Sequence, residues 1–118
     1  MNKIYHLKTC DTCKRILKSI PELHRFELQE IKEQSITVKQ LEELFALSGS
    51  YEKLFSKRAK LYKEMGLKEE QLTEVDFKRY ILEHYTFLNR PVIIYNQQIF
   101  IGNSPKIQQQ LLEALQHE

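Results

Sequence analysis

The chain has 118 residues, of which 42% are hydrophobic and 29% are charged, enough for one domain with its own hydrophobic core. Its formal net charge of +2 gives no electrostatic basis for direct binding to DNA or RNA. No apolar run is long enough to span a bilayer and no signal peptide is visible, so we expect no membrane association and a cytoplasmic location. Structural disulfides are rare in the cytoplasm, so the two cysteines should be reduced at rest.

The first part of the chain predicts a βαβ unit. Residues Lys3–Leu7 indicate a short buried strand, and Asp11–Ser19 indicate a helix with Pro21 beyond its end. Residues His24–Leu28 alternate between polar and apolar side chains, which indicates a second strand. A right-handed crossover joins such strands, so we expect them to be parallel.

The middle of the chain predicts three helices. A capping box formed by Thr37 and Gln40 begins the first helix, and Gly49 ends it. A second apolar stripe at helical spacing is closed by Gly66, and Thr73 can cap the third helix. The apolar residues of these stripes are expected to pack in the core. They are Leu41, Leu44, Phe45, Tyr51, Leu54, Phe55, Tyr62, Met65, Phe77, Tyr80, Ile81 and Tyr85.

The last part of the chain predicts a hairpin followed by a helix. The β-branched run Val92–Tyr95 and the segment Gln98–Ile101 indicate two antiparallel strands joined by an Asn-Gln turn. Ser104 and Pro105 then provide an N-cap and a proline at the first helical position. The buried face of this helix is expected to consist of Ile107, Leu111, Leu112 and Leu115.

This order of elements predicts an α/β fold. A βαβ unit followed by ββα is the minimal thioredoxin-like arrangement, a four-stranded mixed sheet flanked by helices. The helical segment 36–89 is then an insertion between the second and third strands. We expect residues 1–118 to form a single domain that includes this insertion.

Both cysteines, Cys10 and Cys13, fall in a C-x-x-C motif between the first strand and the first helix. The first turn of a helix has unpaired N–H groups and a partial positive charge, which favour a thiolate over a thiol. Lys14 and Arg15 add positive charge nearby, and Asp11 partly opposes it. The position therefore predicts a nucleophilic or redox-active pair.

Two other interpretations of the cysteine pair are open. A structural zinc site needs a second pair of ligands, and no two histidines of the chain have ligand spacing, so we predict no metal. The histidines are His6, His24, His84 and His117. The pair could also be two inert buried thiols. The strand-to-helix position favours the reactive pair over both.

Three segments carry a resemblance to a known family. Tyr5-His6 followed by Cys10 is similar to the cysteine loop of arsenate reductases, and the segments Tyr62–Leu67 and Leu88–Ile93 also fit those enzymes. The chain thus resembles the arsenate reductase (ArsC) family in the broad sense. That family belongs to the thioredoxin-like superfamily and includes glutaredoxin-coupled arsenate reductases and Spx-type transcription regulators.

The resemblance implies a thiol-dependent oxidoreductase in which Cys10 is the nucleophile and Cys13 resolves its adduct. It also implies that Pro91 is cis and faces the nucleophile, and that Arg90 binds an anionic substrate or supports the reactive sulfur. The implied substrate is a small oxyanion or a disulfide. No cofactor is bound, and glutathione, glutaredoxin or thioredoxin is the reductant. The other candidates for anion binding or support are His6, Lys8, Thr9, Thr12, Lys14, Arg58 and Pro91.

The arsenate reductase pattern is incomplete. Leu7-Lys8 stands where those enzymes usually have Asn-Pro. They also have one arginine where this chain has Ser56 and another near Gly102-Asn103, where this chain has none. An oxyanion is held by several charge-assisted hydrogen bonds, so these differences count against arsenate as the substrate. The matches at Tyr5-His6 and Leu88–Ile93 still favour a thiol reductase over a second interpretation.

That second interpretation is an Spx-like redox-sensing transcription regulator. Cys13 completes the C-x-x-C of Spx, and Ser56–Tyr62 resembles the Spx segment in that region. Gly49 falls where Spx has a glycine implied in contact with RNA polymerase. The resemblance then implies that Gly49 and Arg58 bind the C-terminal domain of the polymerase α subunit.

Overall fold

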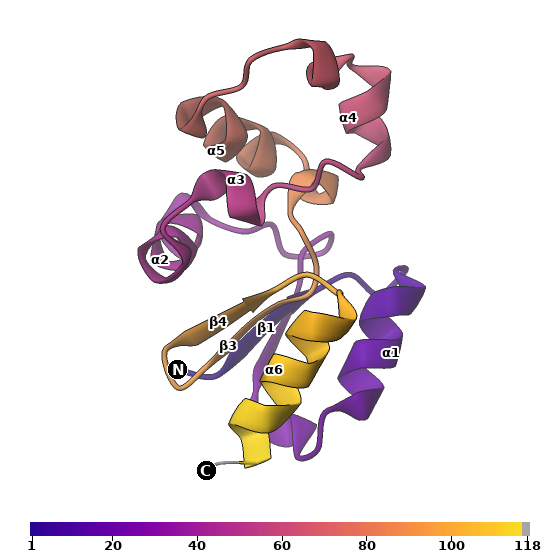
Figure 1. The fold of residues 1–118 in the computed structure, drawn as a ribbon, viewed down its shortest axis with the longest axis vertical. Helices are drawn as coiled ribbons and strands as arrows, with labels where there is room; N and C mark the ends of the chain where they lie inside the picture. The colour runs from indigo at the N-terminus through magenta and orange to yellow at the C-terminus, as the bar shows by residue number, and fades with distance from the viewer. Residues whose placement is uncertain (117–118) are drawn as a thin grey trace. The chain divides into compact units, whose positions relative to one another are not determined.

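A computed structural model describes residues 1–116, so His117 lies outside the described residues. The chain forms two compact units (Figure 1). The first unit comprises Met1–Glu33 and the chain from Arg90 onward, and the second comprises Gln34–Asn89. The boundaries of the second unit are close to those expected for the helical insertion, and the folding of both units as one domain stays a prediction.

The first unit is built on a four-stranded mixed sheet. Its strands are β1 (Lys3–His6), β2 (Glu27–Glu30), β3 (Val92–Tyr95) and β4 (Gln98–Ile101), in the order β2-β1-β3-β4. β1 is parallel to β2 and antiparallel to β3, and β3 is antiparallel to β4. The predicted fold class and strand directions are therefore confirmed.

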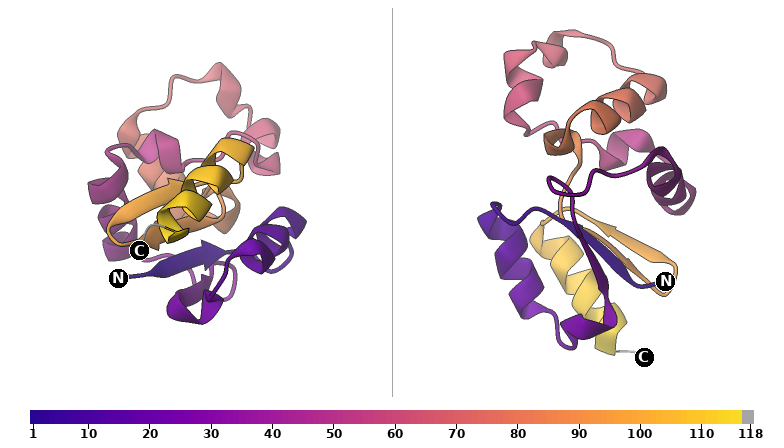
Figure 2. Two further views of the ribbon diagram at one scale, coloured as in Figure 1. Left: turned by 60° about the horizontal axis from the view of Figure 1, so that its bottom comes forward. Right: turned by 180° about the vertical axis from the view of Figure 1, so that it is seen from behind.

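Helices α1 (Asp11–Ser19) and α6 (Pro105–Gln116) pack against the same face of this sheet (Figures 1 and 2). One buried cluster joins them to the strands. Its members are Ile4, Ile16, Ile20, Phe26, Ile93, Tyr95, Phe100 and Leu111. α1 has the predicted bounds, and the Ser104 hydroxyl accepts a hydrogen bond from the Ile107 N–H at 3.2 Å, as expected for the N-cap of α6.

The second strand begins later than predicted. Leu23–Arg25 form a short 3-10 helix, η1, after Glu22 turns the chain with a φ of 55°. The Phe26 N–H bonds to the Leu23 carbonyl, and β2 starts at Glu27. The expectation of a strand over His24–Leu28 was wrong. The alternating polar and apolar residues of this segment belong partly to η1 and partly to β2.

The second unit is helical and begins with α2 (Val38–Ser48). The predicted capping box is present, because the Thr37 hydroxyl accepts from the Gln40 N–H at 3.0 Å and the Gln40 side chain accepts from the Thr37 N–H at 3.0 Å. Gly49 ends the helix with a φ of 78°, a left-handed conformation that glycine adopts without a steric penalty.

The expected second helix of this unit is divided into α3 (Tyr51–Leu54) and α4 (Lys60–Glu64). Phe55 between them has an extended backbone and forms an isolated β-bridge with Leu88. The expectation of one helix was wrong because this bridge to a distant segment replaces local helical hydrogen bonds.

Thr73 caps the last long helix of this unit, α5 (Glu74–Glu83), as predicted. Two 3-10 helices flank it, η2 (Leu67–Glu69) and η3 (Tyr85–Phe87), so Tyr85 lies outside α5. The core centres on Phe55, whose ring centroid lies 4.9 Å from that of Phe77 and 5.2 Å from that of Phe87. Phe45 and Met65, which were expected in the core, are 36% and 49% exposed. None of the helices within residues 1–116 is long and apolar enough to cross a membrane.

Candidate thiol site

The cysteine loop follows the carboxyl end of β1. The Cys10 N–H donates to the Leu7 carbonyl at 3.1 Å, which closes a tight turn over Lys8 and Thr9. Cys10 is the N-cap residue of α1, with extended backbone angles, and Cys13 lies in the first turn of the helix. Both cysteines are free thiols. The strand and helix boundaries therefore place the pair where the N–H groups of a helix start are unpaired.

The sulfur of Cys10 is partly exposed and its pKa lies below the ordinary value of 9.0. Burial is the largest single influence and raises this pKa, but the hydrogen bonds from the backbone N–H and the thiol of Cys13, together with the charge and hydrogen bond of the Arg90 guanidinium, lower it by more. Each of these groups stabilises the anion more than the thiol. Cys10 therefore forms its thiolate at lower pH than an ordinary cysteine.

The sulfur of Cys13 has the opposite character. The residue is 1% exposed, and burial raises the pKa of its thiol to about 12. The proximity of Cys10 raises this pKa further, while the Leu7 backbone N–H opposes the shift. Cys13 therefore keeps its proton while Cys10 loses one, and it donates that S–H toward the neighbouring sulfur.

Arg90 reaches the site from a distant part of the sequence. It precedes β3, and the antiparallel register that pairs Tyr5 with Val92 brings the start of β3 beside the end of β1. The Arg90–Pro91 peptide bond is cis, as the resemblance implied. The Asn103 side chain donates to the Arg90 carbonyl at 3.5 Å and the Gly102 N–H donates to the Pro91 carbonyl at 2.9 Å, so the backbone of this step is fixed on both residues.

His6, at the end of β1, is half-buried. Burial lowers the pKa of its imidazole, Glu30 opposes that change, and Lys8 reinforces it. The ring is therefore neutral at pH 7. Glu30 lies opposite His6 in the register between β1 and β2, and its carboxylate is the charged group that influences this histidine most.

The other predicted anion contacts are divided between the two units. In the first unit, Lys8 pairs with Glu33 at 3.3 Å and Lys14 pairs weakly with Asp11 at 3.9 Å, so both ammonium groups already face a carboxylate. Thr9 is exposed and Thr12 is half-buried in the first turn of α1.

Two predicted residues belong to the second unit. Arg58 is exposed between α3 and α4, and Gly49 is exposed at the end of α2. Neither is part of the unit that holds the cysteines. The sequence-based prediction therefore divides into a thiol site in the first unit and a separate candidate surface in the second.

The comparison with protein families covers most of the chain. The model of the ArsC family matches residues 5–111. The chain belongs to the ArsC family. The matched range includes the cysteine loop, the Arg90–Pro91 step and the first half of α6, so it spans every predicted site residue.

Solved ArsC-like structures share the fold. An ArsC family related protein from Bacteroides fragilis superposes with a TM-score of 0.78 at 22% identity, covering 93% of this chain and 96% of that one. An arsenate reductase from Vibrio cholerae gives a TM-score of 0.71 at 24% identity, with 95% of both chains covered. These similarities establish the architecture of this ArsC family member.

A curated relative points in another direction. The protein named global transcriptional regulator Spx 2 from Bacillus anthracis is 27% identical over 103 residues, which is 84% of this chain and 77% of that protein. The chain is thus similar both to a solved structure named as an arsenate reductase and to a protein named as a transcriptional regulator.

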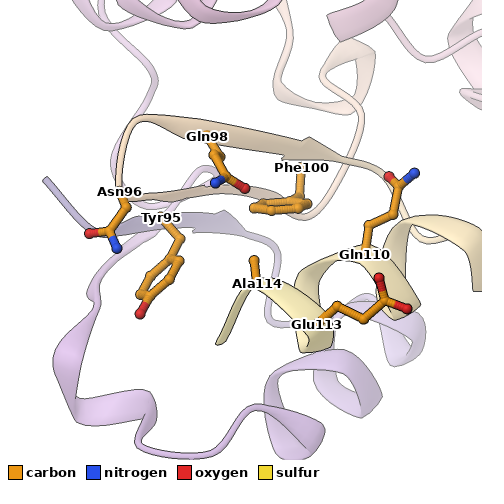
Figure 3. Close-up of a pocket in the computed structure, with 7 residues that line it drawn as sticks. All are labelled: Tyr95, Asn96, Gln98, Phe100, Gln110, Glu113 and Ala114. Atoms are coloured by element: carbon orange, nitrogen blue, oxygen red, sulfur yellow. The ribbon is translucent and has the colours of Figure 1, made fainter. Parts of the chain in front are cut away.

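Two cavities lie in the first unit of this ArsC family member. One, of about 460 Å³, adjoins the cysteine loop and has a mostly apolar lining to which three lysines belong. It is lined by His6, Leu7, Lys8, Lys14, Leu17 and Lys18. The other, of about 510 Å³, lies between the β3–β4 hairpin and α6 and is lined by none of the predicted site residues (Figure 3). Its polar groups are amides, the Tyr95 hydroxyl and the Glu113 carboxylate, so it offers no thiol chemistry.

Sequence reasoning did not identify Glu30 or the role of the Leu7 N–H. The signal for Glu30 was its position at the carboxyl end of a strand parallel to β1, which is the end where the cysteine loop begins. Placing the second strand too early hid that signal. Within residues 1–116, no three His, Cys, Asp or Glu side chains are grouped so as to hold a metal ion.

Proposed function

We propose that the chain is a thiol–disulfide oxidoreductase of the ArsC type, with Cys10 as nucleophile and Cys13 as resolving cysteine. The observation that carries this proposal is the opposite shift of two neighbouring thiols. The pKa of Cys10 is lowered, and that of Cys13 is raised to about 12. In such a pair, one sulfur is the nucleophile of the first step, and the other stays protonated until the second step.

The first step uses the anion of Cys10. With a disulfide substrate RS–SR′, the thiolate attacks one sulfur, a Cys10–SR bond forms, and R′S⁻ leaves and takes up a proton from solvent. With arsenate, the thiolate displaces a hydroxyl group and forms a Cys10–arsenic bond, and the hydroxide takes up a proton from solvent and leaves as water. The Arg90 guanidinium, which contacts the sulfur, then also faces the negative charge of the substrate.

The second step uses Cys13. Once Cys10 is bonded to the substrate it no longer raises the pKa of Cys13 by its charge. The Cys13 thiol loses its proton and attacks the Cys10 sulfur. The Cys10–Cys13 bond forms, and RS⁻, or arsenic reduced from As(V) to As(III), leaves with the electron pair. A dithiol or two thiols, from glutaredoxin, thioredoxin or glutathione, then supply two electrons and two protons and restore both cysteines.

A turnover assay tests this proposal. The wild-type chain is supplied with glutathione and glutaredoxin, and with either arsenate or a small mixed disulfide as substrate. We expect turnover of at least one substrate, loss of turnover in Cys10→Ser, and accumulation of a mixed adduct in Cys13→Ser. Turnover that persists in Cys10→Ser, or no turnover of either substrate, contradicts the proposal.

The relative named Spx 2 supports a second candidate, a redox-regulated protein that binds the C-terminal domain of the RNA polymerase α subunit. Gly49 and Gly66 provide a matched pair for its test. Both are exposed, both have positive φ (78° and 65°), and an added Cβ would meet nothing within 4 Å at either position. Asparagine tolerates this conformation better than other non-glycine residues. If Gly49 contacts the polymerase, Gly49→Asn should abolish its capture and Gly66→Asn should not. Capture by Gly49→Asn, or no capture in either redox state, contradicts this candidate.

A further inference from the structure

Glu30 is a buried carboxylate whose two oxygens accept hydrogen bonds from three backbone N–H groups. It is 9% exposed at the end of β2. Its Oε1 accepts from Lys32 at 2.7 Å and from Glu33 at 2.8 Å, which closes the turn after β2. Its Oε2 accepts from the Lys8 N–H at 2.8 Å.

The bond to Lys8 joins two segments that are distant in sequence. Lys8 lies in the turn that Leu7 and Cys10 close, so the carboxylate fixes the cysteine loop to the end of β2. Burial raises the pKa of Glu30, but the N–H groups of Lys8, Glu33 and Lys32 lower it by more, so the group is ionised at neutral pH. Hydrogen bonds to an ionised acceptor are among the stronger ones in proteins.

We propose that Glu30 is a positioning residue for Cys10, because its carboxylate anchors the Lys8 backbone and thereby holds the Cys10 sulfur against the Cys13 N–H and the Arg90 guanidinium. This inference rests on the proposed role of Cys10 as nucleophile. A carboxylate is required because it presents two acceptor oxygens, whereas an amide presents one oxygen and a donor nitrogen. With glutamine here, either the Lys8 N–H or the turn after β2 faces an N–H₂ group.

The direction in which the Cys10 pKa changes in Glu30→Gln distinguishes a positioning role of Glu30 from an effect of its charge alone. The Glu30 carboxylate is negative, so its removal by itself would stabilise a nearby thiolate and lower the pKa of Cys10. Release of the loop would instead weaken the hydrogen bonds from Cys13 and Arg90 and raise that pKa. His6, Lys8 and Glu33 also lie around this carboxylate, and Glu30→Gln leaves all three of these side chains in the chain.

Glu33→Gln is the matched control. Glu33 carries the same charge on the same turn, its side chain is 66% exposed, and it pairs with the Lys8 ammonium group, not with the backbone. The substitution removes one negative charge and leaves the Glu33 N–H bond to Glu30 available. If the hydrogen bond from the Lys8 N–H to Glu30 positions Cys10, the Cys10 pKa should rise in Glu30→Gln and not in Glu33→Gln.

The test measures the alkylation rate of Cys10 against pH, by mass spectrometry, in reduced wild type, Glu30→Gln and Glu33→Gln. Glu30→Gln should shift the Cys10 pKa upward by about one unit, which reduces alkylation by about tenfold at pH values below the wild-type Cys10 pKa. Glu33→Gln should match wild type. A Cys10 pKa that is unchanged or lowered in Glu30→Gln overturns the inference. If Glu30→Gln does not fold, Glu30→Asp keeps the charge but shortens the side chain, and it should raise the same pKa.

A second readout separates failure of this inference from failure of the proposed function. A wild-type Cys10 pKa in the ordinary thiol range would overturn the nucleophile role itself. Amide hydrogen exchange at Lys8 then tests the anchor alone, because loss of the carboxylate acceptor should speed this exchange in Glu30→Gln and not in Glu33→Gln. Equal Lys8 exchange in wild type and Glu30→Gln overturns the anchor.

Discussion

The Arg90 guanidinium lies against the Cys10 sulfur and donates a hydrogen bond to it, although the whole second unit separates the two residues in the sequence. The contact depends on the sheet, because β3 pairs with β1 in the register that brings the start of β3 to the cysteine loop. The thiolate is thus supported by the start of α1 and by a cation from the segment that precedes β3.

The first prediction concerns Arg90. Arg90→Ala removes both the charge and the hydrogen bond at Cys10, so the Cys10 pKa should rise by about one unit and alkylation should fall by roughly tenfold at pH values below the wild-type Cys10 pKa. Arg90→Lys keeps the charge without the planar donor geometry, so its Cys10 alkylation rate should lie between those of wild type and Arg90→Ala. Arg15→Ala, on the exposed side of α1, is the control and should match wild type. Equal rates in wild type and Arg90→Ala would show that the guanidinium does not support the sulfur.

The second prediction concerns stability at high pH. The Cys13 pKa is raised from 9.0 to about 12 in the folded chain, so between these values the unfolded chain releases a proton that the folded chain retains. This contribution to stability is complete below pH 9 and is lost as the pH rises toward 12, at no more than about 1.4 kcal/mol per pH unit. In urea unfolding of the reduced protein between pH 8 and about pH 10.5, Cys13→Ala should lose stability less steeply than wild type. An equal dependence of the unfolding free energy on pH in wild type and Cys13→Ala would contradict the raised pKa of Cys13.

The third prediction concerns the histidine next to Glu30. The Glu30 charge favours the protonated His6 ring, so Glu30→Gln should lower the His6 pKa further below its usual 6.5. Glu33→Gln should lower it less, because Glu33 contributes less to the same shift. Ring chemical shifts of His6 followed against pH provide the measurement. A His6 pKa that rises in Glu30→Gln would place the carboxylate away from the ring.

The fourth prediction concerns the core of the first unit. Ile93 is 2% exposed in the cluster that joins the sheet to both helices. Ile93→Ala should lower the free energy of unfolding by about 2–5 kcal/mol, because it removes buried methyl groups and leaves a cavity. Val75→Ala, at a residue that is 74% exposed on α5, should change it by less than about 0.5 kcal/mol. An equal decrease in the free energy of unfolding in Ile93→Ala and Val75→Ala would contradict the assignment of Ile93 to the core.

The elements set by local signals could be predicted from the sequence. The helix Asp11–Ser19 has its predicted bounds, and the caps at Thr37, Thr73 and Ser104 are present, because each depends on residues within one or two turns. The cysteine pair was identified in the same way, from its position between a strand and a helix.

What could not be predicted depends on contacts between distant segments. The break between α3 and α4 comes from the bridge of Phe55 to Leu88, which no local pattern contains. The Glu30 anchor needs the β1–β2 register, and the unequal burial of Cys10 and Cys13 needs the packed structure. Arg90 was identified through the family resemblance, and the structure adds its contact with the sulfur.

The pKa of Cys10 in the reduced wild-type chain is the measurement that tests the central claim most directly. The pH dependence of alkylation should show Cys10 reacting as a thiolate with a pKa below 9.0, while Cys13 stays unlabelled until far more alkaline pH, in keeping with a pKa of about 12. Slow and equal labelling of both cysteines, with a shared pKa near 9, would contradict it.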